Sequence, residues 1–354
     1  MTERRDLPEM RALALTETGG PDRLALLELP APVLAAPDDV RVRVRAAALN
    51  HLDLFVTEGL KGLAYTFPHV VGSDGAGVVE AVGPAVPTLR PGDRVMLNPG
   101  VACLRCAACD AGEHPLCERY AILGEHRPGT AADYVVVPAR NVARVPDAMA
   151  WPEAAAFSLA ALTAWRMLVT RARLRAGETV LIWGIGGGVA QASLAVAKLA
   201  GARVIVTSSS DEKLLAARAA GADAGVNHAT GDVVAEVRRV ADRRGVDVVV
   251  DTVGERTWET SLRCLAPLGR LVTCGATSGP MVTTDARRLF WKQWDILGST
   301  MGTQAEYAAV VALAHRGLLW PRVDRVVPLA DGVEAFRRMA AGAQHGKLVI
   351  EVSS

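Results

Sequence analysis

The sequence has almost no excess charge of either sign. Its 354 residues contain 39 Lys and Arg against 38 Asp and Glu, which gives a net charge of +1. A balanced chain lacks the sequence-wide field that would steer nucleic acid or an anionic membrane toward it. We therefore expect a small-molecule substrate, with neither nucleic acid nor a membrane as partner.

Long apolar runs are also missing. The longest, residues 154–165, contains Ser158 and Thr163, ends at Arg166 and is well short of the ~20 residues that span a bilayer. Residues 1–10 are followed by no apolar segment or cleavage pattern of a secretory signal. These absences predict a cytoplasmic location. The length, at roughly 150 residues per domain, predicts about two domains.

The pattern of the chain changes twice. Up to about residue 144, short β-type runs are cut by Gly and Pro. Strand-like and helix-like segments then alternate, which indicates βαβ units around a parallel sheet. The expected strands are 179–183, 203–207, 246–252 and 270–274, and the expected helices are 189–200 and 211–220. Beyond residue 296 we expect a further helix at 305–316 and a closing strand at 347–352.

A glycine-rich turn follows the first of these strands. The sequence there is Gly184-Ile-Gly186-Gly187-Gly188-Val189-Ala190, and the predicted helix starts directly after the glycines. Glycine permits a tight turn and lets backbone N–H groups approach a pyrophosphate at the positive end of the helix. Strand, turn and helix in this order are the context of a dinucleotide-binding site. A tight turn without a ligand is the alternative.

The second strand ends in serines where an NAD-selective site would have an acid. Residues 207–210 are Thr-Ser-Ser-Ser, about 20 residues after the glycines. Ser208 and Ser209 can donate hydrogen bonds to a 2′-phosphate, and Lys213 can neutralise it. We therefore expect NADP(H) to be preferred over NAD(H). A solvated, serine-rich loop is the alternative.

Four of the six cysteines fall within fifteen residues, at Cys103, Cys106, Cys109 and Cys117. Four closely spaced thiolates can form a closed tetrahedral zinc site, which stabilises a loop and leaves no open position for substrate. The sequence therefore predicts one structural Zn²⁺. Free or disulfide-bonded cysteines are the alternative.

These motifs together resemble the zinc-containing medium-chain dehydrogenase/reductase superfamily over almost the full length. The resemblance also rests on Gly72-Ser-Asp-Gly-Ala-Gly77, Pro91-Gly-Asp-Arg-Val95 and Gly346-Lys-Leu-Val349. It implies an α/β fold with a GroES-like β-rich catalytic domain and a Rossmann domain with a doubly wound parallel sheet. We expect the catalytic domain at 1–160, with a zinc lobe at about 98–120, to be completed by 298–354. The Rossmann domain is expected at 161–297.

Members of this superfamily that oxidise alcohols hold a catalytic zinc through a Cys-His-x-Asp segment, a Gly-His-Glu segment and a third Cys or carboxylate. The matching positions here are Asn50-His51-Leu52-Asp53 and Gly72-Ser73-Asp74, and the third region is Phe157-Ser-Leu-Ala160. Neutral amide and hydroxyl oxygens are poor zinc ligands. An ordinary catalytic zinc is therefore not expected.

Asn50 and the segment Leu162-Thr163-Ala-Trp165 resemble the quinone oxidoreductase and enone reductase branch, whose members lack catalytic zinc and use NADPH. That branch implies a lysine and, fifteen positions later, an aromatic residue beside the 2′-phosphate; Lys213 matches, and His228 stands at the second position. Many simple quinone reductases lack the zinc lobe, so the substrate stays open. The expected cofactor-binding residues are Thr163, Gly184, Gly186, Gly187, Gly188, Val189, Ala190, Ser208, Ser209, Lys213, His228, Cys274 and Gly275.

The leading hypothesis is a reductase in which NADPH delivers hydride to an α,β-unsaturated carbonyl or a quinone. Asn50 and Ser73 are the candidate hydrogen-bond donors to the developing enolate oxygen, and His51 is the candidate acid. Asp53 and Asp74 are expected to support the site. The alternative is that Asn50 and His51 only hold the loop or the cofactor phosphates.

Two other functions stay open. One is an alcohol or aldehyde dehydrogenase with an atypical zinc site built from His51, Asp53 and Asp74. The other is a non-catalytic NADPH-binding protein. The resemblance also implies a homodimer or homotetramer, joined by the edges of the Rossmann sheets near residues 281–284.

Overall fold

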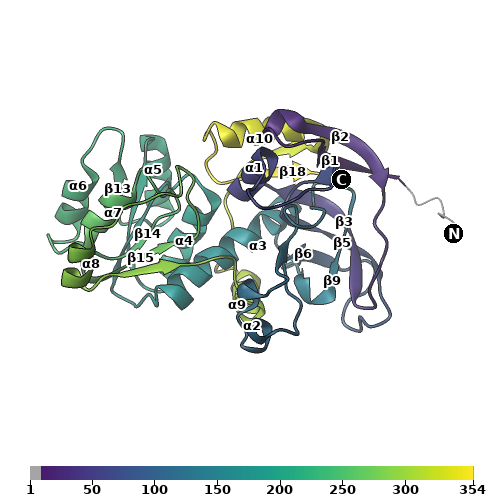
Figure 1. The fold of residues 1–354 in the computed structure, drawn as a ribbon, viewed down its shortest axis with the longest axis horizontal. Coiled ribbons are helices and arrows are strands. Elements are labelled where there is room, and N and C mark those ends of the chain that lie inside the picture. Colours follow the sequence, from purple (N-terminus) through teal and green to yellow (C-terminus); the bar gives the residue numbers. More distant parts are fainter. Residues whose placement is uncertain (1–8, 354) are drawn as a thin grey trace. The chain divides into compact units, whose positions relative to one another are not determined.

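The computed structural model describes residues 9–353, which divide into two compact units (Figure 1). Within the described range, unit 1 comprises residues 9–159 and 321–353, and unit 2 comprises Ala160–Trp320. The first boundary lies one residue from the expected position. The chain returns to unit 1 at Pro321 and not at 298, so the segment 298–320 groups with unit 2.

Unit 1 is β-rich. Its elements are β1 (Glu9–Leu15), β2 (Leu24–Pro30), β3 (Asp39–Ala48), α1 (His51–Glu58), β4 (His69–Val70), β5 (Asp74–Val82), β6 (Arg94–Leu97), β7 (Gly100–Val101), α2 (Ala107–Asp110), β8 (Ala121–Ile122), β9 (Tyr134–Pro138), β10 (Val142–Arg144), β17 (Val323–Pro328), α10 (Gly332–Ala340) and β18 (Lys347–Glu351). The main sheet has the order β10-β6-β5-β3-β18-β17, and β9 also pairs with β3. Strand β18 pairs antiparallel with β3, so the end of the chain completes the sheet.

The core of unit 1 lies between this sheet and α10. Val40, Val42 and Val44 alternate along β3 and are fully buried in one cluster with Phe336 and other apolar side chains. The motif glycine Gly77 lies opposite Val44 where β5 pairs with β3, and a Cβ atom there would come within 2.1 Å of the Arg43 carbonyl oxygen. Only glycine allows this close approach of two strands.

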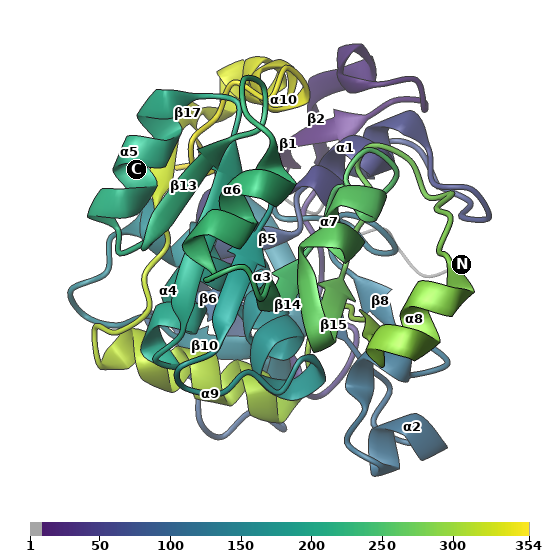
Figure 2. The same ribbon diagram turned by 90° about the vertical axis from the view of Figure 1, so that its left-hand side faces the viewer.

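Unit 2 is a parallel sheet with helices (Figure 2). Its elements are β11 (Thr179–Ile182), α4 (Gly188–Leu199), β12 (Arg203–Ser208), α5 (Asp211–Ala219), β13 (Ala224–Asn227), α6 (Val233–Val240), β14 (Val246–Val250), α7 (Trp258–Cys264), β15 (Leu265–Thr273), α8 (Ala286–Lys292), β16 (Asp295–Gly298) and α9 (Gln304–His315). The sheet order is β13-β12-β11-β14-β15-β16, and every pairing is parallel. Strands β11, β12 and β14 are almost entirely buried, as expected for strands covered on both faces.

The apolar run of the sequence forms α3 (Trp151–Trp165), which continues into a π-helical turn, Arg166–Arg171. Arg166 is buried and forms an ion pair with Glu306 of α9, with a distance of 2.9 Å between Nη1 and Oε2. A buried arginine needs such a partner, and this pair links α9 to the rest of unit 2. In the part of the chain that the structure describes, no helix is long and apolar enough to cross a membrane.

Candidate active site

Helix capping fixes the segment Asn50–Asp53. Strand β3 ends at Ala48 and α1 begins at His51, which makes Asn50 the N-cap residue. The Oδ2 atom of Asp53, the third residue of α1, accepts a hydrogen bond of 2.6 Å from the backbone N–H of Asn50. Asn and Asp are favoured at these positions because their side chains satisfy backbone groups that have no partner within the helix.

The side-chain amide of Asn50 reaches a second acid, Asp74, at the start of β5. Asn50 Nδ2 donates to Asp74 Oδ2 at 3.0 Å, and the backbone N–H of Leu159 donates to Asp74 Oδ1 at 2.8 Å. Asp74 is fully buried, so these donors and a cation described next replace the water it has lost.

The cation is Lys347, the first residue of β18. Its Nζ atom lies 2.6 Å from Asn50 Oδ1 and 2.9 Å from Asp74 Oδ2, and the side chain is only 3% exposed. An ammonium group only donates and a carboxylate only accepts, so these contacts fix the orientation of the Asn50 amide. The sequence analysis missed Lys347, although it lies in the motif Gly346-Lys-Leu-Val349. A lysine directly before the apolar run Leu348–Ile350 of the closing strand was the available signal.

Ser73 and Asp53 form the other half of this buried network. Ser73 Oγ donates to Asp53 Oδ1 at 3.2 Å, and both residues are fully buried. Burial raises the pKa of Asp53 to about 6, although the hydrogen bond from the Asn50 backbone and the charge of Lys347 act in the opposite direction. The single hydroxyl proton of Ser73 is therefore directed at Asp53, and Asp53 can gain or lose a proton near neutral pH.

His51, the first residue of α1, is exposed. Desolvation by the surrounding protein lowers the pKa of the His51 imidazole below its ordinary value, and the positive charge of Lys347 adds a smaller effect in the same direction. His51 is thus neutral at pH 7, where it can donate one hydrogen bond and accept another.

The site does not fit an ordinary catalytic zinc. Asn50 and Ser73 occupy two of the three ligand positions, and Asp74 is already paired with the Lys347 ammonium. Neither His51, Asp53 nor Asp74 belongs to a cluster of possible ligands. Among residues 9–353, the four cysteines form the only group of three or more His, Cys, Asp or Glu side chains close enough to hold a metal.

The cysteine cluster does fit a structural zinc. The sulfur atoms of Cys103, Cys106, Cys109 and Cys117 all lie within 4.8 Å of one another, and none of the four forms a disulfide. The backbone N–H groups of Cys103 and Arg119 point at Cys117 Sγ, at 3.3 and 3.4 Å. Four thiolates with N–H donors around them are the usual surroundings of tetrahedral zinc, which would fasten the loop between β7 and β8.

The expected cofactor residues of unit 2 follow the carboxyl ends of its parallel strands. The glycine turn follows β11, and Gly184 there has φ 66°, a left-handed conformation that favours glycine. Gly187 is the N-cap of α4 and Gly188 its first residue, so N–H groups without helical partners stand at this end. Ile185 in the turn donates its N–H to the Thr207 carbonyl of β12 at 2.9 Å. The turn fits a dinucleotide pyrophosphate.

The other expected cofactor residues lie at the ends of neighbouring strands. Ser208 ends β12, and Ser209 is exposed directly after it. Lys213 lies in the first turn of α5, whose N-cap Ser210 accepts a hydrogen bond from its backbone. His228 follows β13, with its ring centroid 6.0 Å from that of Trp183. Cys274 and Gly275 follow β15.

Thr163 comes from α3 and is buried. Its Oγ1 atom has no hydrogen-bond partner among the described residues. A buried hydroxyl without a partner is uncommon and suits a polar group of a ligand.

The chain matches two families over most of its length. Residues 188–316 match the family "Zinc-binding dehydrogenase", and residues 36–147 match the "Alcohol dehydrogenase GroES-like domain". The chain is 33% identical over 350 residues to a zinc-type alcohol dehydrogenase-like protein of Schizosaccharomyces pombe, covering 97% of this chain and 99% of that protein. It is also 33% identical to a quinone oxidoreductase of Pseudomonas aeruginosa, over 94% of this chain and 96% of that one.

A solved structure, of an NAD-dependent alcohol dehydrogenase, superimposes with a TM-score of 0.94 at 44% identity and covers 97% of this chain and 100% of that chain. Both the sequence and the fold therefore have relatives over nearly the whole chain. The expected fold class, a GroES-like unit with a Rossmann-like parallel sheet, is confirmed. The chain belongs to the medium-chain dehydrogenase/reductase superfamily and is an oxidoreductase.

Proposed function

We propose that this enzyme is an NADPH-dependent reductase that transfers a hydride to the activated C=C of an α,β-unsaturated carbonyl, or to a quinone, without a catalytic zinc. The supporting observation is the contact of the Lys347 ammonium with both Asn50 and Asp74. A cation there neutralises the one carboxylate of the Gly72-Ser73-Asp74 segment. Hydrogen bonds must then stabilise the negative charge on the substrate oxygen, a role that zinc has in alcohol dehydrogenases.

Asn50 is the proposed donor to the substrate. Bound NADPH supplies the hydride, and negative charge then grows on the substrate's carbonyl oxygen. One amide hydrogen of Asn50 donates to Asp74, which leaves the second for that oxygen. Lys347 and Asp74 hold the amide in place, so little reorganisation is needed during reaction, and one such donor contributes roughly 10²–10³ in rate.

The proton that completes the reduction is proposed to come through His51 or from water. The lowered pKa keeps His51 neutral at pH 7. We propose that its imidazole passes a proton from solvent to the substrate and does not carry a permanent positive charge. Asp53 and Ser73 are buried and act through Asn50, whose backbone Asp53 holds.

NADPH is the proposed cofactor because no carboxylate stands in the segment Thr207-Ser208-Ser209-Ser210. Ser208 and Ser209 are proposed to donate to the 2′-phosphate, Lys213 to neutralise it and His228 to border it. The solved relative named as NAD-dependent makes this preference the first point to measure.

The same relative favours a second candidate function, oxidation of an alcohol or reduction of an aldehyde. A zinc would then need a first shell other than the family's, from His51, Asp53 and Asp74. Lys347 would have to leave Asp74 first, because the ammonium and the metal would compete for the same oxygens.

A homodimer is the proposed assembly. Strand β16 lies at the edge of the unit 2 sheet, with unpaired backbone groups on its outer side. Met281 and Trp291, close in sequence, are 79% and 78% exposed, which is unusual for large apolar side chains unless a partner covers them. Light scattering would test whether the protein is a dimer.

We propose the cytoplasm as the location of the enzyme, because the free cysteines of the cluster suit a reducing compartment.

The test of the proposed function is reduction of a panel of enones and quinones with NADPH, for the parent enzyme and Asn50→Ala. We expect the variant to lose about 10²-fold in kcat while its NADPH affinity changes little. An equal loss of both would mean that Asn50 serves the cofactor. Turnover of alcohols alone would favour the second candidate.

A further inference from the structure

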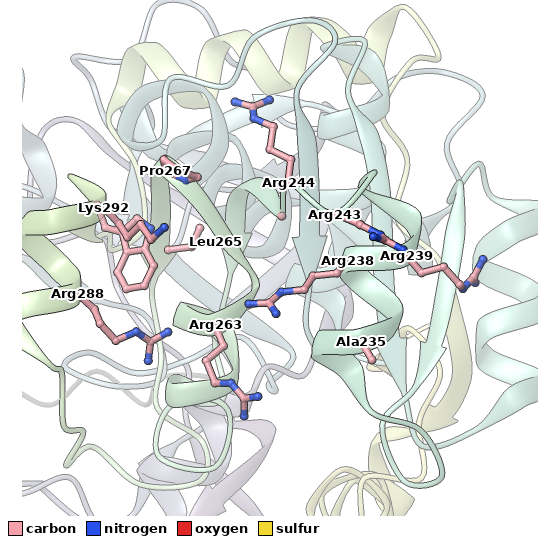
Figure 3. A pocket seen from close by; sticks show the side chains of 12 residues that line it. Ala235, Arg238, Arg239, Arg243, Arg244, Arg263, Leu265, Pro267, Arg288 and Lys292 are labelled. Carbon is pink, nitrogen blue, oxygen red and sulfur yellow. The ribbon is translucent and has the colours of Figure 1, made fainter.

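Unit 2 contains a polar cavity that the proposed function does not use. It has a volume of about 550 Å³ and lies among α6, the loop that follows α6, α7, the start of β15 and α8 (Figure 3). This size is typical of sites for small organic ligands. Strands β14 and β15 begin beside the cavity, whereas the glycine turn and the serines follow strand ends. The cavity therefore lies at the end of the sheet where the parallel strands begin, and the expected dinucleotide site lies at the end where they finish.

The lining is strongly basic. Seven of its residues are cationic and, among the described residues, none is acidic; the cations are Arg238, Arg239, Arg243, Arg244, Arg263, Arg288 and Lys292. This concentration stands out in a chain whose net charge is only +1.

Neighbouring carboxylates pair with only three of the seven. Arg239 pairs with Glu236 at 2.8 Å, Arg244 with Asp247 at 3.0 Å and Arg288 with Glu259 at 2.8 Å. The remaining four, Arg238, Arg243, Arg263 and Lys292, form no ion pair with the carboxylates of residues 9–353.

Helix ends account for part of this charge. Arg238, Arg263 and Lys292 lie in the last turns of α6, α7 and α8, where a cation complements the partial negative charge of a helix C-terminus. At roughly half a charge for each helix end, the cavity still keeps a net charge of about +2 to +3. Arginines crowded in this way repel one another unless an anion joins them.

Two of the arginines without an ion pair, Arg238 and Arg263, line the same part of the cavity. In Figure 3, Arg238 of α6 and Arg263 of α7 are neighbours, although their side chains extend in different directions, whereas Arg239 points away from both. Both also act on one neighbour, the Cys264 thiol: burial raises its pKa to about 12, and the charges of Arg238 and Arg263 oppose that rise. Guanidinium groups bind phosphate through paired N–H donors, so two neighbouring arginines that point in different directions suit a chain of several phosphates better than a single carboxylate.

We propose that this cavity binds a small anion with several phosphate groups, a triphosphate chain either free or as part of a nucleotide. Arg238 and Arg263 hold the phosphates, and Arg243 and Lys292 border the site. The site is separate from the dinucleotide cofactor and gives the enzyme a means to sense a phosphorylated metabolite.

The experiment is calorimetric titration of the full-length protein with inorganic tripolyphosphate and, separately, with ATP, at about 0.1 M salt. We expect saturable binding of one ligand per chain, weakened about tenfold or more in the double variant Arg238→Ala/Arg263→Ala. Tighter binding of ATP would identify a nucleotide as the ligand, and equal binding would identify the phosphate chain alone. Either result supports the site.

Two controls locate the binding. Arg239→Ala removes a neighbouring cation that points away, and Lys213→Ala removes a cation at the expected cofactor site; both should leave the tripolyphosphate affinity within about twofold. The double variant Arg238→Lys/Arg263→Lys keeps the charge and should bind with intermediate affinity. All exchanged residues except Lys213 are exposed, so the variants should fold, as thermal melting would verify.

Three results would overturn the proposal. One is no saturable binding to the parent protein, and another is equal binding to Arg238→Ala/Arg263→Ala. The third is a single-stranded RNA that binds more tightly than tripolyphosphate through the same arginines, which would make the cavity part of a nucleic-acid surface. None of these results bears on NADPH-dependent reduction, which the double variant should retain.

Discussion

Lys347 and Asn50 are 297 positions apart in the chain, yet Lys347 Nζ lies 2.6 Å from Asn50 Oδ1. The pairing of β18 with β3 brings them together, because β3 runs into the segment that contains Asn50 and Lys347 begins β18. Asp74, at the start of β5, joins from the other side of β3. The central sheet of unit 1 thus positions all three groups.

Breaking this contact should destabilise the protein strongly. Lys347→Met leaves Asp74 buried without its cation and should lower the free energy of unfolding by about 3–5 kcal/mol. The double variant Lys347→Met/Asp74→Asn removes both charges and should recover most of that loss in urea unfolding. Lys198→Met, which breaks the more exposed pair with Asp223, should cost about 1 kcal/mol or less. Similar losses for Lys347→Met and Lys198→Met would contradict a buried, coupled pair.

Asp53 should make the protein less stable as pH rises from about 4 to about 6. Its pKa is raised by burial to about 6 in the folded state, so within this window the folded state binds more protons than the unfolded state, and stability falls with pH. Asp53→Asn should remove this fall, worth up to about 3 kcal/mol, in unfolding measured at several pH values.

Asp93 provides the control for Asp53, because its pKa is shifted in the opposite direction. The side-chain hydrogen bond from Arg144 lowers the pKa of Asp93, so its stabilising contribution is present above the unfolded pKa and is lost as pH falls. Asp93→Asn should therefore reduce stability at neutral pH and not at acidic pH. If Asp53→Asn and Asp93→Asn changed the pH profile in the same direction, the assignment for Asp53 would be wrong.

The cofactor preference should depend on α5 and the serines before it. Lys213→Ala should raise the Kd for NADPH about tenfold and leave that for NADH unchanged, because only NADPH has the 2′-phosphate. Ser209→Asp should shift the preference further toward NADH by repulsion. Arg218→Ala, in the last turn of the same helix, is the matched control. Equal losses for both cofactors would refute the 2′-phosphate contact.

The cysteine cluster should affect the stability of the protein and not the chemical step. Cys103→Ser should lower the zinc content and the melting temperature of unit 1, while any folded fraction keeps its kcat with NADPH. Cys264→Ala, a buried cysteine outside the cluster, should keep its zinc while losing some stability. Full zinc content in Cys103→Ser would exclude the four-cysteine shell.

Much of the fold could be predicted from local pattern. The βαβ alternation located β11, α4, β12, α5 and β14 to within two residues, since long apolar runs and capping residues determine these elements. Short or polar elements such as β13, α8 and β16 escaped detection. The compact unit 2 extends to Trp320 and not to the expected 297; the buried Arg166–Glu306 pair, whose residues are 140 positions apart, links α9 to this unit.

The sequence pointed to residues that lie together in the structure, but not to the contacts that connect them. Family motifs pointed to Asn50, Asp53, Ser73 and Asp74, which do form one buried network. The role of Lys347 depends on strand pairing between the two ends of the chain, which no local pattern reveals. The basic cavity was missed as well: four of its seven cations lie at residues 238–244, but the other three come from α7 and α8, which no local pattern joins to this segment.

The central claim is that hydrogen bonds held by Lys347, and not a metal, support hydride transfer. The most direct measurement is the zinc content per chain of enzyme purified without chelator, together with its NADPH-dependent reduction of an enone. We predict one zinc per chain and enone reduction that persists in the presence of a chelator too weak to remove zinc from the four cysteines. Two zinc ions per chain, with activity lost when the second is removed, would contradict the account.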